Sequence, residues 1–282
     1  MKTLEKIQQI QSALNAEKKL QKSIGFVPTM GALHEGHLSL LRQAREENDV
    51  LVCSVFVNPI QFNNAEDLNN YPRNLDADLQ KMQAEGCDYV FAPSTEEMYP
   101  EPVADQYDFG NLERVMEGKF RPGHFNGVAI VVRKLFEIIQ PDKAYFGKKD
   151  FQQLQIIRRL VDMISLDIDI VSVPISREPD GLARSSRNSR LTPEERKIAP
   201  NIYKIITAAK DNINQFQTPA EMKSWGLNEL NKISRLQPEY FEIVDMDTLE
   251  PIEQWSDTNR CILCLAVFLG QVRLIDNIVL FS

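Results

Sequence analysis

The stretch 28–41, which reads PTMGALHEGHLSLL, constrains most strongly what this chain can fold into. A short apolar segment, 23–27, precedes it and predicts a buried strand. The apolar residues that follow, at positions 38, 40, 41 and 44, have the spacing of a helix face. We therefore predict a strand, a glycine-containing turn and a helix that begins near Gly36. In α/β sheets such a turn presents backbone N–H groups and a helix dipole to an anion.

Two of the three histidines of the chain, His34 and His37, lie in this turn and are three residues apart. Residues at that spacing share one face of a helical turn. Imidazole groups there can donate to phosphate oxygens and stabilise negative charge that grows during a reaction. The alternative is a helix start with two exposed polar residues. The flanking glycines, Gly31 and Gly36, let a ligand approach the backbone and favour the functional interpretation.

Further apolar segments recur over the first two thirds of the chain and predict the other strands of one sheet. We expect strands at 49–57, 88–91, 143–146 and 168–173, helices at 3–20, 75–85, 128–139 and 151–163, and a polar loop at 63–73. Strands and helices that alternate at these lengths predict an α/β fold with a Rossmann-like doubly wound parallel sheet. Such sheets bind ligands at the carboxyl ends of their strands, where Asn58, Gln61 and Gly147 are expected.

After Pro174 the pattern changes to a polar and basic segment, 176–191, without apolar periodicity. Thr192-Pro193 and Thr218-Pro219 are typical helix starts, so we expect two helices. Three apolar segments, 240–244, 261–269 and 272–280, then predict strands. We therefore expect a larger domain over 1–176 and a smaller C-terminal α+β domain over 177–282.

Charge and composition exclude several classes of protein. The 282 residues carry a formal net charge of −8, whereas a general nucleic-acid binder usually presents a broad basic field. No apolar run reaches the roughly 18 residues that a membrane span needs. The mixed-charge N-terminus lacks the apolar core of a secretion signal, so we expect a cytoplasmic protein.

The four cysteines give no disulfide framework. Cys261 and Cys264 have C-x-x-C spacing, but they lie within an expected strand. Alternation along a strand places residues three apart on opposite faces of the sheet, which disfavours a metal or redox role. Cys53 and Cys87 are interpreted as small core residues.

The motif His34-Glu35-Gly36-His37 resembles the HxGH signature of the nucleotidyltransferase superfamily. The longer string PTMGALHEGH, at 28–37, is more specific and resembles the pantothenate synthetase (pantoate–β-alanine ligase) family. Matches at FVNPIQF (56–62), KKDFQQ (148–153) and DGLARSSRN (180–188) occur in the order of that family. The resemblance covers roughly the first two thirds of the chain.

This resemblance implies an activity. A member of the family condenses (R)-pantoate with β-alanine, using ATP, to give pantothenate, a coenzyme A precursor, with AMP and pyrophosphate. A pantoyl adenylate is the intermediate. The family is usually a homodimer, which we expect here as well. We also expect Mg²⁺ on the phosphates, and the charge and the lack of a long apolar run predict no nucleic-acid or membrane partner. We expect the smaller domain to close over the site as a lid, because an adenylate must be kept from water.

The resemblance also assigns the substrate-binding residues. Gln61 matches a position that contacts pantoate and β-alanine, and Gln153 matches one that binds pantoate; Asn58 is expected beside Gln61. An amide both donates and accepts, as a hydroxy acid requires. A glutamine near a proline is otherwise usually an ordinary loop residue.

The expected catalytic groups stabilise charge on the phosphates during adenylation: His34, His37, Lys149 and Arg187. The residues expected to line the ATP site are Met30, Gly31, Ala32, Leu33, His34, Glu35, Gly36, His37, Gly147, Lys148, Lys149, Asp150, Ser176, Arg184, Ser185, Ser186 and Arg187.

Some positions leave alternatives open. Lys148 stands where the family is commonly acidic, and Arg184 stands where methionine is more frequent, so their side-chain roles are undecided. His124, in the RPGHFNG loop, either lines the site or fixes its loop. The segment 180–188, taken alone, also fits a basic hinge between domains.

Two other functions compete with the ligase. One is a nucleotidyltransferase that passes AMP or CMP to another small acceptor; Gln61 and Gln153 count against it. The other is a non-enzymatic nucleotide sensor or an RNA-binding relative of the synthetases, which the acidic balance disfavours.

Overall fold

The computed structural model describes residues 1–62, 68–69 and 71–282, so the loop expected at 63–73 lies partly outside the described residues. The chain forms two compact units. Unit 1 comprises 1–109, 121–148 and 153–174, and unit 2 comprises 110–120, 149–152 and 175–282. The last segment of unit 2 begins at residue 175, two residues before the expected boundary at 177. Unit 2 also includes two earlier segments of the chain.

Unit 1 is built on a six-stranded sheet with the strand order β1-β4-β3-β2-β5-β6, in which each neighbouring pair is parallel. This confirms the predicted α/β fold with a doubly wound parallel sheet. The strands are β1 (Lys2–Leu4), β2 (Ile24–Thr29), β3 (Val50–Val55), β4 (Tyr89–Phe91), β5 (Lys143–Gly147) and β6 (Asp169–Val173).

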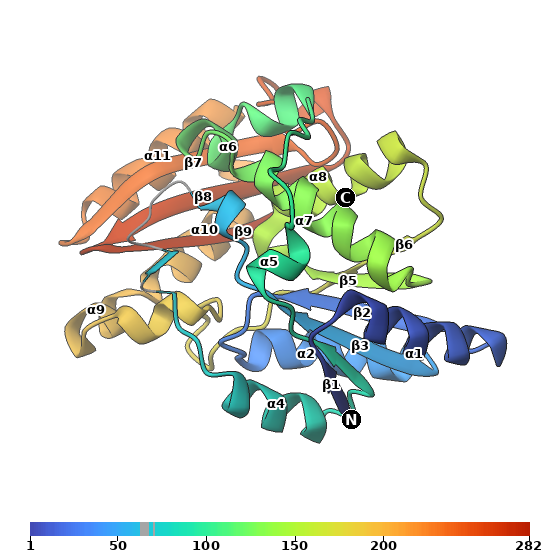
Figure 1. Cartoon of the computed structure of the whole chain (residues 1–282). Helices are drawn as coiled ribbons and strands as arrows, with labels where there is room; N and C mark the ends of the chain where they lie inside the picture. Colours follow the sequence, from blue (N-terminus) through green and yellow to red (C-terminus); the bar gives the residue numbers. More distant parts are fainter. Residues whose placement is uncertain (63–67, 70) are drawn as a thin grey trace. The chain divides into compact units, whose positions relative to one another are not determined.

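The helices of unit 1 cover both faces of this sheet. Helices α2 and α4 lie on one face, and α1, α7 and α8 lie on the other (Figure 1). Leu41 and Ala44 of α2 and Met82 of α4 pack on the first face, while Phe136 of α7 stacks edge-on against Phe26 on the second. The helices are α1 (Ile7–Lys19), α2 (Glu35–Glu47), α4 (Leu75–Ala84), α5 (Thr95–Met98), α7 (His124–Ile139) and α8 (Phe151–Ile164).

The strand order places one turn at the centre of the fold. β2 lies between β3 and β5, and the chain leaves β2 toward β3 but leaves β5 in the opposite direction, toward β6. The segments that follow β2 and β5 therefore emerge together at the topological switch point. Open α/β sheets bind their ligands there.

The N-terminal prediction was wrong in one respect. A helix was expected over 3–20, but Lys2–Leu4 forms β1 and the helix begins at Ile7. The Lys2 N–H donates to the Asp88 carbonyl, and the Leu4 carbonyl accepts from the Ala92 N–H. These edge hydrogen bonds to the β4 region outweigh a local helical periodicity to which Leu4 contributed.

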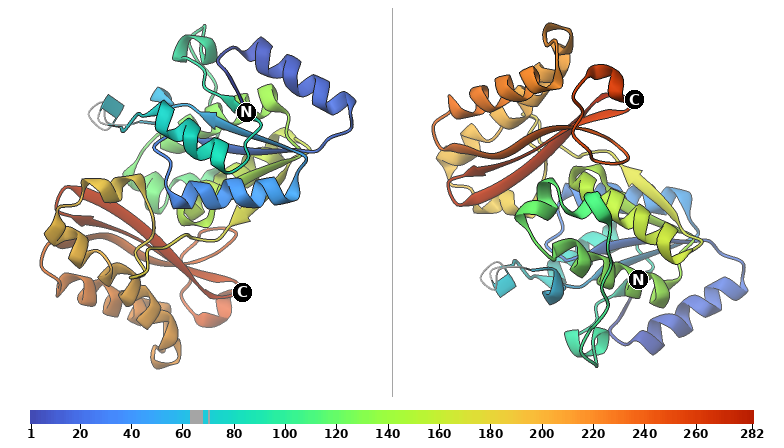
Figure 2. Two further views of the ribbon diagram at one scale, coloured as in Figure 1. Left: turned by 90° about the horizontal axis from the view of Figure 1, so that it is seen from below. Right: turned by 90° about the horizontal axis from the view of Figure 1, so that it is seen from above.

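Unit 2 contains a three-stranded antiparallel sheet in the order β7-β8-β9, with α10 and α11 packed on one face, as both views of Figure 2 show. Residues of α6 and the first residue of α8, Met116 and Phe151, pack on the other face. The elements are α6 (Met116–Phe120), α9 (Pro193–Ile198), α10 (Asn201–Asp211), α11 (Pro219–Asn231), β7 (Leu236–Asp245), β8 (Cys261–Leu269) and β9 (Val272–Phe281).

The first of the two expected C-terminal helices is in fact two. α9 ends at Ile198, and α10 begins at Asn201 after Pro200. Proline has no N–H to donate and its ring crowds the preceding turn, so one helix cannot run through it easily. The predicted threonine caps are present, because Thr192 accepts from the Glu195 N–H and Thr218 accepts from the Glu221 N–H.

A buried cluster of charges ties α6 to the sheet of unit 2. Arg273 of β9 donates to both carboxylate oxygens of Glu117, at 2.8 and 2.7 Å, and Tyr240 donates to the same carboxylate at 2.8 Å. Glu239 accepts a further hydrogen bond from Arg273. Removing one member would leave a buried charge without its partner.

Among the described helices, none has both the length and the apolarity that crossing a bilayer requires.

Cys261 and Cys264 lie on opposite faces of β8, as predicted. Cys261 packs among the residues that face α10 and α11, and Cys264 packs among those that face α6. All four thiols are buried and free. Burial raises the pKa of Cys87 and Cys261 to about 12 and raises those of Cys53 and Cys264 as well.

We therefore expect the native thiols to be unreactive at pH 8, because the thiolate is the reactive form and these pKa values keep it scarce. Labelling with a thiol-specific chromogenic disulfide should modify less than about one thiol per chain within minutes. The same reaction in guanidinium should modify all four cysteines. Rapid labelling of the native protein would contradict this assignment.

Candidate active site

The turn after β2 has an uncommon backbone. Gly31 and Ala32 have φ angles of +80° and +52°, and the second is unfavourable for a residue with a side chain. The Thr29 hydroxyl accepts from the Gly31 N–H at 3.2 Å. A Cβ at Gly31 would lie 3.0 Å from an oxygen of Asp78 and 3.1 Å from Val55. Glycine is therefore needed both for its conformation and for space.

Asp78 of α4 holds this turn in place. Its two carboxylate oxygens accept from the Ala32 N–H and the Leu33 N–H, each at 2.8 Å. Lys81, one helical turn later, donates to the Leu33 carbonyl at 2.6 Å. Asp78 is 2% exposed, so these bonds form away from water, where a lost partner is costly. Asp78 belongs to no motif and was not predicted as a site residue.

His34 and His37 lie side by side at the start of α2, with their ring centroids 4.1 Å apart. His34 Nδ1 accepts from the Gly36 N–H at 3.1 Å, and His37 Nδ1 accepts from the His34 N–H at 3.3 Å. The two rings thus form a capping box for α2, which begins at Glu35. Because both Nδ1 atoms accept, the proton of each neutral ring is on Nε2, which makes Nε2 the donor.

The amides predicted after β3 form a buried network. Tyr99 donates to Asn58 Oδ1 at 2.9 Å, and Asn58 Nδ2 donates to Gln61 Oε1 at 3.2 Å and to the Gly127 carbonyl at 3.0 Å. Gln61 Nε2 in turn donates to Met30 Sδ at 3.0 Å. Asn58 is fully buried and Gln61 is 8% exposed. This network brings Met30, Asn58 and Gln61 together; Tyr99 was not predicted.

His124 fixes the loop that carries Gln61. Its Nδ1 donates to the Gln61 carbonyl at 2.8 Å, and the side chain is buried. One turn later in α7, a Cβ at Gly127 would lie 2.6 Å from Gln61 Cα. The loop therefore packs directly on the backbone of α7. His124 was expected in a loop, but it is the first residue of α7, and the loop that it holds is that of Gln61 and not its own.

The remaining predicted residues of unit 1 lie at or beside the carboxyl end of β5. Gly147 is the last residue of β5, which pairs with β2 in parallel, and Lys148 follows it. Both are half-buried, as is Gln153 in the first turn of α8.

Unit 2 contains Lys149, Asp150, Ser176 and 184–187. The Lys149 ammonium lies 4.0 Å from the Asp150 carboxylate. The Ser176 carbonyl accepts from the Arg184 N–H at 3.0 Å, which closes a tight loop. We propose below that these residues act together with those of unit 1.

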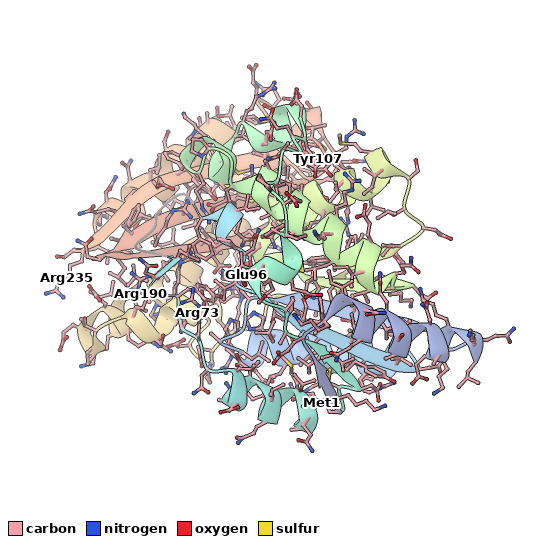
Figure 3. The ribbon with its side chains drawn as sticks, in the orientation of Figure 1. Met1, Arg73, Glu96, Tyr107, Arg190 and Arg235 are labelled. Carbon is pink, nitrogen blue, oxygen red and sulfur yellow. The ribbon has the colours of Figure 1, made fainter. Side chains whose placement is uncertain are left out.

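Within the basic loop, the side chains have different roles. Arg184 Nε donates to the Arg177 carbonyl at 3.3 Å, and its guanidinium pairs with Glu178 at 3.1 Å. Arg184 thus stabilises its own loop. The Ser185 hydroxyl accepts from the Arg187 N–H and begins a 3₁₀ turn, Ser186–Arg190, whose last residue is exposed (Figure 3).

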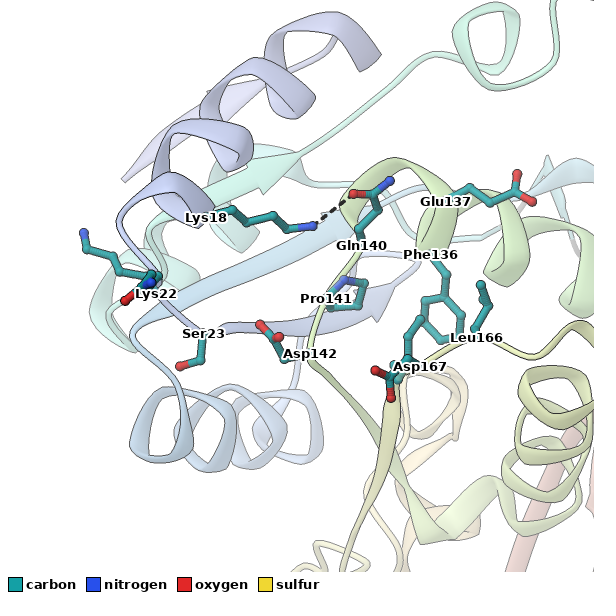
Figure 4. A pocket seen from close by; sticks show the side chains of 12 residues that line it. Lys18, Lys22, Ser23, Phe136, Glu137, Gln140, Pro141, Asp142, Leu166 and Asp167 are labelled. Carbon is teal, nitrogen blue, oxygen red and sulfur yellow. Dashed lines mark hydrogen bonds between the residues drawn. The ribbon is translucent and has the colours of Figure 1, made fainter.

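A cavity of about 680 Å³ lies at the other edge of the parallel sheet. Its walls include Ser23, Asp142 and Ile168, which precede β2, β5 and β6, and Lys18 donates to Gln140 across it (Figure 4). This is the amino edge of the strands, whereas ligands of such folds bind at the carboxyl edge. Asp142 and Gln140 are exposed, so we do not assign the active site to this cavity.

A doubly wound sheet with an HxGH turn at its switch point and buried amides beside it defines an α/β enzyme of the nucleotidyltransferase class. Residues 2–279 match the family model described as pantoate-beta-alanine ligase. The chain belongs to the pantoate–β-alanine ligase family.

Relatives and solved structures agree with this assignment. A pantothenate synthetase of Porphyromonas gingivalis is 53% identical over 258 residues, 92% of each chain, and one of Bacteroides fragilis is 50% identical over 282 residues, 99% of this chain and 98% of the relative. The crystal structure of pantothenate synthetase from Thermus thermophilus is 42% identical, with a TM-score of 0.93 over the whole of both chains. That of Francisella tularensis pantoate-beta-alanine ligase, complexed with Beta-gamma ATP and Beta-alanine, is 36% identical, with a TM-score of 0.81 over 99% of this chain and 98% of that one.

We expect Asp78→Asn to disturb the turn that carries His34. The substitution keeps the shape of the side chain but replaces one acceptor oxygen with an NH₂ group that faces a backbone N–H. Stability should fall by about 1–3 kcal/mol, and ATP-dependent pyrophosphate release should fall at least about tenfold, because small displacements of catalytic groups are costly. Urea unfolding and a coupled pyrophosphate assay measure the two effects.

Asp76→Asn is the matched control, because Asp76 is an exposed carboxylate in the same first turn of α4. It should leave both quantities near those of the wild type. Equal behaviour of the two variants would show that the Asp78 carboxylate does not hold the turn.

Proposed function

We propose that this chain condenses (R)-pantoate with β-alanine through a pantoyl adenylate formed from ATP. The observation that carries the proposal is the buried amide network beside the HxGH turn, in a chain that matches pantoate–β-alanine ligases over nearly its full length. The F. tularensis relative, complexed with Beta-gamma ATP and Beta-alanine, supports two of the three substrates.

The chemistry requires activation of a carboxylate. In the first step a pantoate carboxylate oxygen attacks the α-phosphorus of ATP, and the bond to the β-phosphate breaks, which releases pyrophosphate. In the second step the amine of β-alanine attacks the pantoyl carbonyl and loses a proton, and AMP leaves. The chain supplies positioning and charge stabilisation in both steps, and no covalent enzyme intermediate is needed.

We assign charge stabilisation to His34 and His37 together with Lys149 and Arg187. Backbone N–H groups occupy Nδ1 of both imidazoles, so the Nε2–H groups are the donors that we assign to the phosphate oxygens. The N-terminus of α2 adds its dipole. Lys149 and Arg187 contribute full positive charges, which the acidic chain as a whole does not provide.

We assign the binding of pantoate to Gln61 and Gln153 and that of β-alanine to Gln61, with the buried Asn58 acting through Gln61. Asn58 donates to Gln61 Oε1, which fixes the orientation of the glutamine amide and presents Nε2 as its donor end. In this structure Nε2 donates to the thioether of Met30, a weak acceptor. A substrate carboxylate or hydroxyl oxygen is a stronger acceptor and would replace it.

Mg²⁺ is proposed as a companion of the nucleotide. Across the described residues, no three histidine, cysteine, aspartate or glutamate side chains are grouped so as to hold a metal ion. Mg²⁺ usually binds with ATP through the phosphates and water, and bound so it would neutralise phosphate charge.

The domain roles are also proposals. We propose that 1–176 binds the nucleotide and pantoate and that 177–282 closes over them as a lid, which would protect the adenylate from hydrolysis. The family resemblance supports a homodimer and a cytoplasmic location; sedimentation equilibrium tests the first.

The function is tested by AMP formation from ATP, D-pantoate and β-alanine with each substrate omitted in turn. We expect AMP and pantothenate only when all three are present, and pyrophosphate release in a single turnover without β-alanine. AMP formation with another acid in place of pantoate would favour a different nucleotidyltransferase.

We expect His37→Ala and His37→Asn to lower the single-turnover rate of adenylate formation by about 10²–10³-fold, the usual cost of losing one such donor. The asparagine variant retains an acceptor near the position of Nδ1 for the His34 N–H but lacks Nε2. It therefore separates catalysis from helix capping. Near wild-type adenylate formation by a folded His37→Asn variant would refute the catalytic role.

A further inference from the structure

The last strand of the chain, β9, carries two adjacent buried polar residues. Asp276 is 4% exposed and Asn277 is 5% exposed. The sequence pattern predicts an apolar strand here and no role for these two residues. Polar side chains so deeply buried require partners.

Asp276 anchors the start of the basic loop. Arg177 donates to both of its carboxylate oxygens, at 2.6 and 2.9 Å, and also to the Gly181 carbonyl at 3.1 Å. The guanidinium of Arg177 lies 3.9 Å from the centre of the Tyr203 ring. Arg177 is thus fixed by a bidentate pair, by a cation–π contact and by the loop that it begins.

Asn277 holds the other basic segment of unit 2. Its Nδ2 donates to the Lys149 carbonyl at 2.9 Å, although the two residues are 128 positions apart. Its own N–H donates to Asp276 Oδ1 at 2.8 Å. Neighbouring residues of one strand therefore bind both the backbone of Lys149 and the residue from which the segment 177–188 departs.

We infer that Asp276 and Asn277 form a positioning pair that holds Lys149 and the basic loop in the arrangement that binds the phosphates of ATP. This inference rests on the proposed function, because it takes Lys149 and Arg187 as phosphate ligands. The pair acts on these ligands through the backbone of Lys149 and through Arg177 at the start of the loop.

Asn277→Ala should raise KM for ATP about tenfold and slow adenylate formation, while KM for pantoate and for β-alanine stays within about twofold, because only the phosphate ligands are displaced. Asn277→Asp should show the same selective defect. It fills the same space, but its carboxylate cannot donate to the Lys149 carbonyl.

The matched control is Asn212→Ala. Asn212 also lies in unit 2, and its Nδ2 donates to a backbone carbonyl, that of Ala208, at 2.8 Å. Its loss should lower stability without changing KM for ATP. A merely structural role of Asn277 would likewise lower the melting temperature and the active fraction and leave KM for ATP unchanged; that result would overturn the inference.

Calorimetric titration with a non-hydrolysable ATP analogue separates this inference from the proposed function. It needs no acid substrate. Weaker binding by both Asn277 variants, with unchanged binding by Asn212→Ala, supports the positioning pair even if the wild-type chain makes no pantothenate. Equal binding by all variants, or no binding by the wild type, would overturn it.

Discussion

Two hydrogen bonds from backbone N–H groups to the buried Asp78 carboxylate are the interaction on which the candidate site depends. They hold Ala32 in a left-handed conformation that it would not adopt alone. The helix start that follows, with its two imidazoles, takes its direction from this turn. α4, which supplies Asp78, packs on the same face of the sheet as α2. The packing of α4 in the core of unit 1 therefore also fixes the geometry of the turn.

The histidines illustrate how one residue can serve both the structure and the proposed chemistry. Each ring has two nitrogens, and the Nδ1 atoms are engaged by the backbone at the start of α2. The remaining nitrogen of each ring then has a defined protonation state, that of a donor. A lysine or arginine at the same position would bring charge but would provide no acceptor for the helix. Histidine is the residue type that satisfies both requirements.

Most of the fold could be predicted from local pattern. Buried parallel strands are continuous apolar runs, and the helices between them have clear periodicity, so both are visible in short windows of sequence. The exceptions have local causes. β1 has three residues, of which only Leu4 is even half-buried, so its pattern is too short to compete with the helical stripe that follows. The break between α9 and α10 follows from Pro200. The helix was predicted from the capping residues at Thr192, and the effect of this proline was not considered.

The site could be predicted only in part. The residues of a motif are contiguous in the sequence, whereas the residues that hold a motif in place lie far from it. The HxGH turn and the amides after β3 are recognisable as strings. Asp78, Tyr99 and Asn277 are single polar residues without a motif, and their partners are 46, 41 and 128 positions away. Such pairings arise from the tertiary fold, which brings distant segments together. No periodicity in the sequence predicts them. His124 shows the same limit: the sequence placed it in a loop, whereas it begins α7 and holds the distant loop of Gln61 through that residue's carbonyl.

The interleaved path of the chain has an evolutionary consequence. Unit 2 takes in 110–120 and 149–152 from within the first part of the sequence, and Met116 and Phe151 from these segments cover one apolar face of its antiparallel sheet. A gene fragment that began after residue 176 would encode that sheet without its cover. Recombination at the obvious junction would therefore yield a module with an exposed apolar surface, prone to self-association. The smaller unit is thus poorly suited to shuffling between proteins, and it is expected to be inherited together with the sheet that precedes it.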